Sequence, residues 1–133
     1  MGLDMYLTGR KFLRSDWETP ANNRTEDGFE IETINLRLGY WRKHPDLHGY
    51  IVQTFANGVD ECQEIDLTAD HLQLVIDAIK ADGLPHTEGF FFGRSENDED
   101  EKKEAIAIFE AAIAWLKVDD GEAWRDVFYR ASW

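Results

Sequence analysis

The middle of the chain gathers residue types that could hold a charged ligand. Arg42 and Lys43 follow Trp41 directly, and His48 and Asp60 lie a short way downstream. An arginine and a lysine can hold a phosphate while the neighbouring indole stacks on a base, a combination that suits nucleotides. We therefore place a candidate ligand site at Trp41, Arg42, Lys43, His48 and Asp60. The alternative is structural: the tryptophan packs in the core and the adjacent basic side chains point into solvent.

Two further chemistries would use the same stretch. His44, His48, Asp60 and Cys62 are suitable metal ligands by type, but the two histidines share a face only if Pro45 starts a helix. Cys62 and His48 could form a nucleophilic pair, although no cysteine-enzyme signature surrounds them. A buried structural thiol is the simpler interpretation of Cys62. We assign no catalytic residue, no metal and no cofactor.

The motifs of several enzyme classes are absent from the sequence. The chain has no Gly-rich phosphate loop ending in Lys-Ser/Thr, no dinucleotide fingerprint, no His-Glu-x-x-His and no Gly-x-Ser-x-Gly elbow. Its many carboxylates make any acid/base pair chosen from the sequence uninformative. The pattern favours a protein that acts by binding over one that catalyses a reaction.

Length and composition are those of one globular domain. The chain has 133 residues, of which 43% are hydrophobic and 13% aromatic, enough for a single core. We treat residues 1–133 as one domain. Cys62 is the only cysteine, so no internal disulfide can form, and no apolar run approaches the ~18 residues that span a bilayer. The sequence predicts a cytoplasmic protein that does not enter a membrane.

The net charge of -13 is unevenly placed along the chain. Residues 1–50 carry seven Lys/Arg and eight Asp/Glu, whereas residues 51–133 carry seven and nineteen. Such a surface repels nucleic acids and anionic membranes and favours encounter with basic partners. We expect a host protein with a basic surface as the partner. The plain alternative is that the acidic excess serves solubility alone.

Two helices are legible from caps and apolar spacing. Thr68 can cap a helix whose apolar residues recur at the i, i+3, i+4, i+7 spacing from Leu72 to Ile79. A longer helix follows the acidic stretch SENDEDEKKE, with Ser95 or Asn97 as its cap, and continues through AIAIFEAAIAWLK. The acidic residues suit the positive end of that helix.

The strand pattern is less regular than the helix pattern. Residues 3–12, 29–41, 62–67, 89–94 and 123–133 fit strands. The segment 15–28 reads as an exposed loop because it is dense in Asn, Asp, Pro and Gly. With a third helix over Pro45 to Phe55, these elements predict an α+β fold. We expect a small, mostly antiparallel sheet with two or three helices packed on one face.

Three consecutive phenylalanines lie between Gly89 and Gly93. Strand geometry puts Phe91 on the face opposite to its two neighbours. If helices cover only one face of the sheet, Phe91 joins Phe128 or Tyr129 of the C-terminal strand in an exposed apolar patch, and such patches usually mark interfaces. We expect this patch to form a two-fold homodimer contact. In the alternative, another segment of the chain covers Phe91.

Several motifs together resemble a set of small phage and prophage proteins. They are the opening MGLDMYL, YWRK at 40–43, NGVDEC at 57–62 and GFFFG at 89–93, with His48 between the second and the third. Their order and spacing run through most of the chain. The resemblance implies a phage origin and carries no settled chemistry. This chain departs from the family pattern at Pro45 and Gly49, which intrude where the relatives run straight from the Trp-Arg-Lys triplet into a helix.

The charge and the resemblance favour a phage or prophage accessory protein that inhibits or modulates a host protein, such as a defence factor. It would dock its acidic surface on a basic one. The rival hypothesis is a binding protein for a nucleotide or a phosphorylated small molecule, which it sequesters or processes at the site around Trp41 and His48. Neither hypothesis involves direct binding to nucleic acid or to a membrane.

Overall fold

The N-terminal strand lies inside the sheet and pairs on both of its sides. A computed structural model describes residues 2–13, 24–87, 95–96, 98–118 and 123–133 of the chain. The elements in chain order are β1 (Asp4–Leu13), β2 (Thr33–Arg42), α1 (Pro45–Phe55), β3 (Ile65–Asp66), α2 (Ala69–Lys80), α3 (Glu99–Leu116) and β4 (Ala123–Ser132). The strand order is β2-β1-β4-β3, and every pair is antiparallel.

The strands agree with the sequence pattern in place more than in length. β1 and β4 pair along their whole lengths, and one register shift interrupts the pairing of β1 with β2. β2 begins at Thr33 and not at residue 29, and the predicted strand over 62–67 shortens to the two residues of β3. The predicted strand over 89–94 lies outside the described residues.

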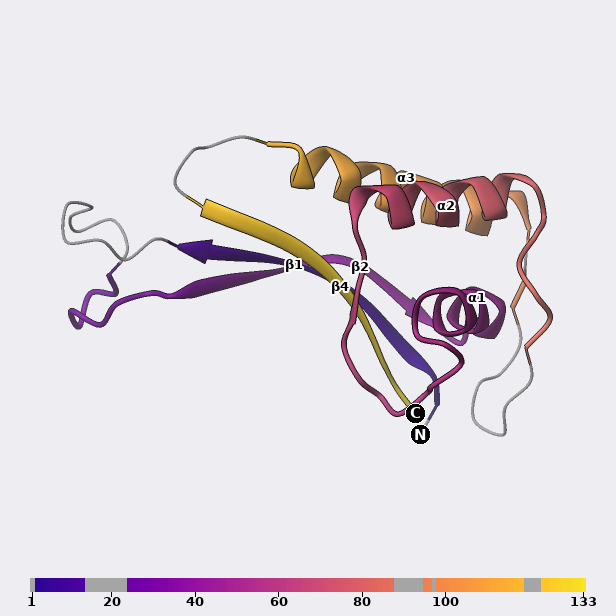
Figure 1. The fold of residues 1–133 in the computed structure, drawn as a ribbon, viewed down its shortest axis with the longest axis horizontal. Helices are drawn as coiled ribbons and strands as arrows, with labels where there is room; N and C mark the ends of the chain where they lie inside the picture. Colours follow the sequence, from indigo (N-terminus) through magenta and orange to yellow (C-terminus); the bar gives the residue numbers. More distant parts are fainter. Residues whose placement is uncertain (1, 14–23, 88–94, 97, 119–122) are drawn as a thin grey trace.

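Alternation along β1 gives the sheet two different faces. Met5 and Leu7 are fully buried on the face that the helices cover, whereas Tyr6 and Thr8 point to the other side and are only half-buried. Figure 1 shows α2 and α3 lying together across the covered face, with α1 near the end of the sheet where both termini lie. No helix covers the other face within the described residues. The predicted α+β fold with helices on one face is confirmed.

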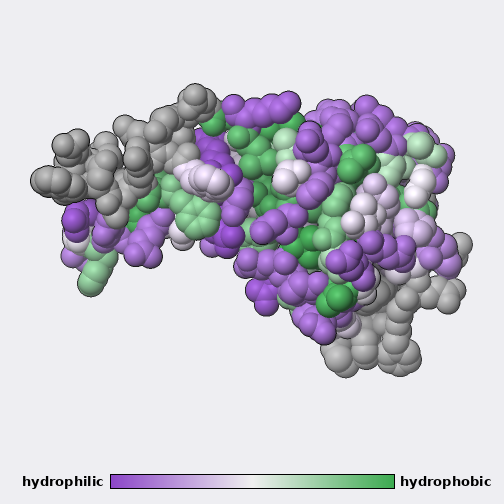
Figure 2. Space-filling view, viewed as in Figure 1, coloured by the Kyte–Doolittle hydropathy of each residue, from purple (hydrophilic) through white to green (hydrophobic). Residues whose placement is uncertain are grey.

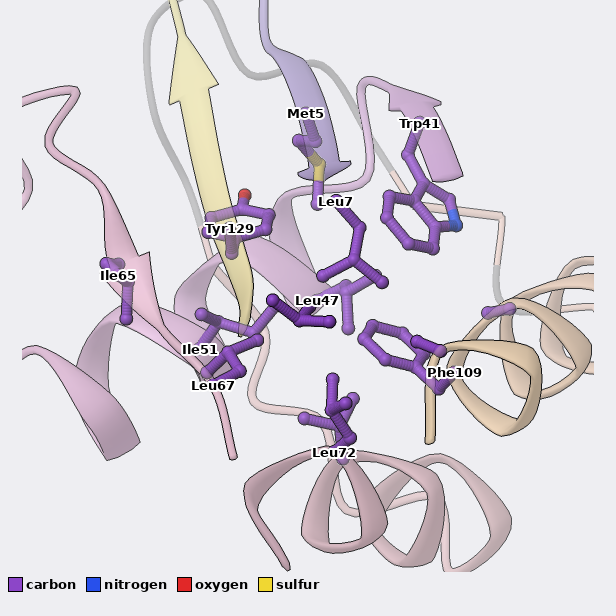
Figure 3. Packing of buried hydrophobic residues seen from close by; sticks show 14 of the residues in the cluster. Met5, Leu7, Trp41, Leu47, Ile51, Ile65, Leu67, Leu72, Phe109 and Tyr129 are labelled. Atoms are coloured by element: carbon purple, nitrogen blue, oxygen red, sulfur yellow. The ribbon is translucent and has the colours of Figure 1, made fainter. Parts of the chain in front are cut away.

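The core lies between the covered face and the three helices. Leu7 of β1, Leu47 of α1, Leu72 of α2 and Phe109 of α3 are each 0% exposed, and their side chains converge in Figure 3. Burial of side chains of this size is worth about 1.5–3 kcal/mol each. One hydrophobic cluster therefore joins β1, α1, α2 and α3.

Both predicted long helices begin at side-chain caps. Thr68 caps α2 as expected: its hydroxyl accepts from the His71 N–H at 3.2 Å, and the His71 ring accepts from the Thr68 N–H at 3.2 Å. α3 is capped by Asp98, whose carboxylate accepts from the Glu101 N–H at 2.7 Å. Ser95, one of the two predicted caps, is therefore not the cap of α3.

α1 forms despite its proline and glycine. Pro45 occupies the first turn, where a missing N–H costs nothing because that group has no partner inside the helix. Gly49 lies in the middle of the helix, where Thr87 packs against it: a Cβ added at Gly49 would lie 1.9 Å from the Thr87 Oγ1. The glycine is required by this close approach and does not interrupt the helix.

The described residues on the face seen in Figure 2 are largely polar. In Figure 2, hydrophilic residues surround smaller hydrophobic areas, and they are dense over the end of the molecule where α2 and α3 lie. None of the helices in the described ranges is long and apolar enough to cross a membrane.

Candidate functional site

Trp41 lies in the core. Its indole is 8% exposed and stacks on the ring of Phe109, with 5.4 Å between the ring centroids. A base could not reach the indole without displacing part of the core. The structural alternative, in which the tryptophan packs in the core, therefore describes Trp41, and it leaves little of the indole exposed for a base to stack on.

The remaining predicted ligand residues do not share one site. Arg42 ends β2 and is exposed, and exposed Lys43 follows it with a positive φ of 56° that turns the chain into α1. The His48 side chain, in contrast, is buried with 2% exposure. Of the predicted set, the structure brings His48 and Asp60 into hydrogen-bond contact.

His48 is the centre of a buried hydrogen-bonded relay. Its Nδ1 lies 2.6 Å from the Tyr129 hydroxyl, and its Nε2 lies 2.9 Å from the Asp60 Oδ2. One tautomer satisfies both contacts: the Tyr129 hydroxyl donates to Nδ1, and Nε2–H donates to the carboxylate. Burial raises the pKa of Tyr129 well above its usual value near 10, and the Asp60 charge raises it further. The phenol therefore stays protonated and acts as the donor.

The contacts of this relay occupy both ring nitrogens of His48. Both ring nitrogens of His48 already have partners, so His48 does not pair with the Cys62 thiol as a nucleophile would require. Within the described ranges, no group of three or more His, Cys, Asp or Glu side chains is placed to hold a metal ion. The relay joins α1, β4 and the loop before β3, which is a structural task.

A second buried relay, centred on His44, was not anticipated from the sequence. The His44 side chain is 5% exposed, its Nδ1 lies 2.8 Å from the Ser95 Oγ, and its Nε2 lies 3.1 Å from the Glu101 Oε1. The Ser95 Oγ also accepts the Asp46 N–H at 3.1 Å. Burial lowers the pKa of His44, while the charges of Glu101 and Asp46 oppose that shift. A neutral ring accepts from Ser95 and donates to Glu101.

The His44 relay borders a small cavity of about 140 Å³. Its order of hydroxyl, imidazole and carboxylate is the one that serine hydrolases use. Here, however, the hydroxyl also fills the capping position at the start of α1, where His44 offers no side-chain cap of its own. A second hydrogen bond, from the Thr87 N–H to the Asp46 carboxylate at 3.0 Å, holds Thr87 against the same first turn of α1. The relay therefore anchors the approach to α3 against α1.

The predicted interface residues are not on an exposed apolar patch. Tyr129 is fully buried on the covered face, where it meets His48. Phe128 is on the other face but is only 7% exposed, because the Arg10 guanidinium lies 4.8 Å from its ring centre. Neither side chain is therefore exposed within the described chain: Tyr129 is in the core, and the Arg10 guanidinium covers Phe128. Phe91 lies outside the described residues.

The sequence shows the close spacing of His44 and His48 but not the partners of either ring. The i, i+4 spacing of His44 and His48 suggests a shared helix face, but His44 precedes the first residue of α1, and the two rings find different partners. Nothing local in the sequence points to Ser95, Glu101 or Tyr129 as those partners. Comparison of the chain with protein-family models, with curated proteins and with solved structures finds no match.

Proposed function

We propose that this protein acts by binding, as a phage or prophage accessory protein that inhibits or modulates a host protein with a basic surface. The observation that carries the proposal is the charge of its helical layer. α2 and α3 carry two exposed lysines and six exposed carboxylates, namely Asp70, Asp77, Glu99, Asp100, Glu104 and Glu110. We call these six residues the acidic helix surface.

Two features of the layer support this choice of surface. A groove of about 600 Å³ runs between α2 and α3, so the surface offered to a partner is concave there. Lys102, which lines the groove, is already paired with Asp82 and lies 3.7 Å from Glu99. Its charge is therefore partly neutralised. Exposed charges of one sign steer a partner of the other sign and set the rate of association.

The two histidine relays also favour binding over catalysis. Both imidazoles are almost inaccessible to solvent, at 5% for His44 and 2% for His48, and each hydrogen-bonds to two groups inside the protein, so a substrate would meet little of either ring. The nucleotide hypothesis at Trp41, Arg42, Lys43 and His48 is less favoured because Trp41 and His48 are buried whereas Arg42 and Lys43 are exposed.

The test is capture of a partner from a bacterial lysate with matched charge variants. The Glu104→Lys/Glu110→Lys variant reverses two charges of the acidic helix surface. The Glu26→Lys/Asp27→Lys variant makes the same charge change at exposed positions between β1 and β2, outside the acidic helix surface. The unmodified protein should retain a partner at low salt and release it at high salt. Only the first variant should lose that partner. Equal loss in both variants, or no salt-sensitive partner, would contradict the proposal.

A homodimer is a second proposal, with a different contact from the one the sequence indicated. Phe12 of β1 and Trp124 of β4 are directly opposite each other in the register, and they are 37% and 72% exposed. An exposed cross-strand aromatic pair of this kind is covered at little cost by the same pair of a second copy. Sedimentation should give a dimer at micromolar concentration and a folded monomer for Trp124→Lys. A monomeric unmodified protein would refute it.

A further inference from the structure

The uncovered face of the sheet contains a hollow with an arginine on each side. Arg37 projects from β2 and Arg130 from β4, and both line an open hollow of about 420 Å³ whose floor includes Tyr6 and Thr8 of β1. Arg37 is opposite Thr8 and Arg130 is opposite Tyr6, so with a strand spacing of about 4.8 Å the two arginines begin roughly 12 Å apart with one strand between them. Two long side chains at that separation can reach one small ligand. We call this feature the arginine hollow.

Arg37 is held in place without the use of its polar edge. Its guanidinium lies 5.3 Å from the ring centre of Tyr6 and 5.8 Å from that of Tyr40. The Tyr40 hydroxyl in turn donates to the Asp4 carboxylate at 2.6 Å, which fixes that ring. A guanidinium stacked on aromatic rings keeps its N–H groups for a ligand in the plane. Within the described residues, no carboxylate lies within ion-pair distance of Arg37.

The other donors of the hollow are also open to a ligand. Arg130 donates its Nε–H to the Cys62 carbonyl at 3.1 Å, which anchors the side chain and leaves its terminal amino groups. In the described part of the chain Arg130 has no carboxylate partner either. Thr8 and Asn35 line the same hollow, and neither side chain hydrogen-bonds to another described residue. The hollow therefore offers two guanidinium groups, a hydroxyl and an amide.

One carboxylate borders the hollow, and it is already engaged. Glu64 lies 3.5 Å from the Arg10 Nη1, and Arg10 also forms a two-point contact with Asp126 at 3.2 and 3.0 Å. Asp66 adds to the same negative group around Arg10. Arg10 thus neutralises part of the acidic charge on this side of the sheet. Among the described residues, Arg37 and Arg130 have no such partner, although the chain carries a net charge of -13.

We propose that the arginine hollow binds the phosphate group of a phosphorylated small molecule, about the size of a mononucleotide. A phosphate monoester carries close to two negative charges at neutral pH, and two guanidinium groups match that charge and its oxygen geometry. Thr8 donates a further hydrogen bond from the floor. The volume falls in the range of roughly 300–1,000 Å³ typical of ligand pockets. A nucleic-acid strand is disfavoured because Glu64, Asp66 and Asp126 continue along the same face and would repel its phosphates.

This site is independent of the proposed partner surface. The hollow is on the uncovered face of the sheet, whereas the acidic helix surface is on α2 and α3 beyond the opposite face. Charge reversals at Glu104 and Glu110 should leave ligand binding intact, and changes at Arg37 or Arg130 should leave partner capture intact. Failure of one proposal is therefore distinguishable from failure of the other.

The experiment is a titration of the unmodified protein with inorganic phosphate, adenosine monophosphate and adenosine. Phosphorus NMR follows the phosphate signal, and calorimetry gives the dissociation constant. We expect saturable binding of the monoester and none of adenosine. Arg37→Gln and Arg130→Gln should each weaken binding about tenfold, because each removes one charge-assisted hydrogen-bonding group. Arg42→Gln removes an exposed arginine of the same strand outside the hollow and should change the constant less than about twofold.

The controls separate the site from general charge effects. Circular dichroism establishes that each variant is folded, and Thr8→Val serves as a second probe of the hollow if Arg37→Gln fails to fold. Absence of saturable phosphate or monoester binding overturns the proposal. Equal weakening by Arg42→Gln overturns it too, since binding would then reflect overall charge. A single-stranded oligonucleotide that binds more tightly than the monoester, with steep salt dependence, overturns the small-molecule assignment.

Discussion

His48 and Tyr129 are more deeply buried than the other buried residues with polar side chains in the described chain, His44 and Asp46. Both are essentially inaccessible to solvent, and each depends on the other for a hydrogen bond of 2.6 Å. A buried polar group that loses its partner costs more than the bond itself is worth, because water cannot replace the lost contact. The pair should therefore behave as a unit when it is mutated.

We predict strong coupling between these two residues. His48→Leu and Tyr129→Phe should each lower the free energy of unfolding by about 1–3 kcal/mol, since each leaves one buried polar group unpaired. The double variant should lose clearly less than the sum, because it leaves no such group at that contact. Urea unfolding measures all three. The matched control is Tyr40→Phe, which removes a hydroxyl on an exposed face and should cost less than about 0.5 kcal/mol. Additive losses would show that the contact is energetically unimportant.

His44 should make stability depend on pH. Its pKa in the folded protein is lowered from 6.5 by burial, so the unfolded chain takes up a proton first as the pH falls. The free energy of unfolding is therefore fully retained above pH 6.5 and declines as the pH falls from there toward the lowered folded pKa. Glu101 and Asp46, which face the ring, limit the size of the effect.

The measurement compares urea midpoints at about pH 7.5 and 5.5 for the unmodified protein and for His44→Gln. Glutamine does not titrate in this range, so the variant should lose less stability over the same interval. An unchanged difference between the two pH values would mean that other groups carry the dependence.

At the scale of elements, α1 is the piece on which the rest depends. It contains His48 and begins directly after His44. In its first turn, the Asp46 N–H donates to the Ser95 hydroxyl and the Asp46 carboxylate accepts from the Thr87 N–H. In the middle of the helix, the absence of a side chain at Gly49 lets Thr87 pack against the backbone. The segment before α3 is thus fastened to α1 by two hydrogen bonds and one close steric contact.

Gly49→Ala tests this steric contact by the sign of its effect. Alanine in a helix interior normally stabilises by about 0.5–1 kcal/mol over glycine. At Gly49 the new Cβ would lie 1.9 Å from the Thr87 Oγ1, so overpacking should instead destabilise by about 1–3 kcal/mol. Thermal unfolding decides between the two. Gly83→Ala is the control, because its Cβ would meet its nearest atom at an ordinary 3.5 Å.

A rescue makes the test specific. Gly49→Ala combined with Thr87→Gly removes the clashing side chain, and it should recover part of the loss relative to Gly49→Ala alone. Should Gly49→Ala stabilise the protein, the packing of Thr87 on α1 would be looser than the structure indicates.

At the scale of the whole molecule, charge is divided between the two sides. The acidic helix surface carries six exposed carboxylates and two exposed lysines accompany it, while arginines from β1, β2 and β4 project from the uncovered face. The net charge of -13 therefore reflects the helices and loops more than the sheet. Like charges spread over a small domain oppose its compact state.

Salt should accordingly stabilise the protein. Raising NaCl from about 20 mM to about 500 mM shortens the screening length and weakens repulsion among the carboxylates. The unfolding temperature should rise over this interval, and the Glu104→Lys/Glu110→Lys variant should show a smaller rise because it starts with less repulsion. A fall in the unfolding temperature with salt would mean that ion pairs such as Arg10 with Asp126 outweigh the repulsion.

Local chemistry in the sequence determined the helices and the class of the fold. Thr68 with the apolar spacing from Leu72 to Ile79 predicts α2 because capping and helical periodicity act within a few residues. The same holds for α3, although its cap is Asp98 and not Ser95 or Asn97. Even α1 was predictable over its full length, since proline is favoured in a first turn. The strands were less legible: residues 3–12 and 123–133 indicated β1 and β4 in place, but β2 and β3 differ in length from the predicted segments.

Only the tertiary structure decided which residues meet. The partners of His48 and His44 in the relays include Tyr129 and Ser95, which are 81 and 51 residues away in the chain, and no local pattern specifies such pairs. Trp41 looked like a ligand platform because its neighbours are basic, but the packing of Phe109 against it decided its place in the core. Arg37 and Arg130 share a hollow only because the strand order puts β1 between β2 and β4. Contacts of this kind follow from topology and register, which the whole chain determines together.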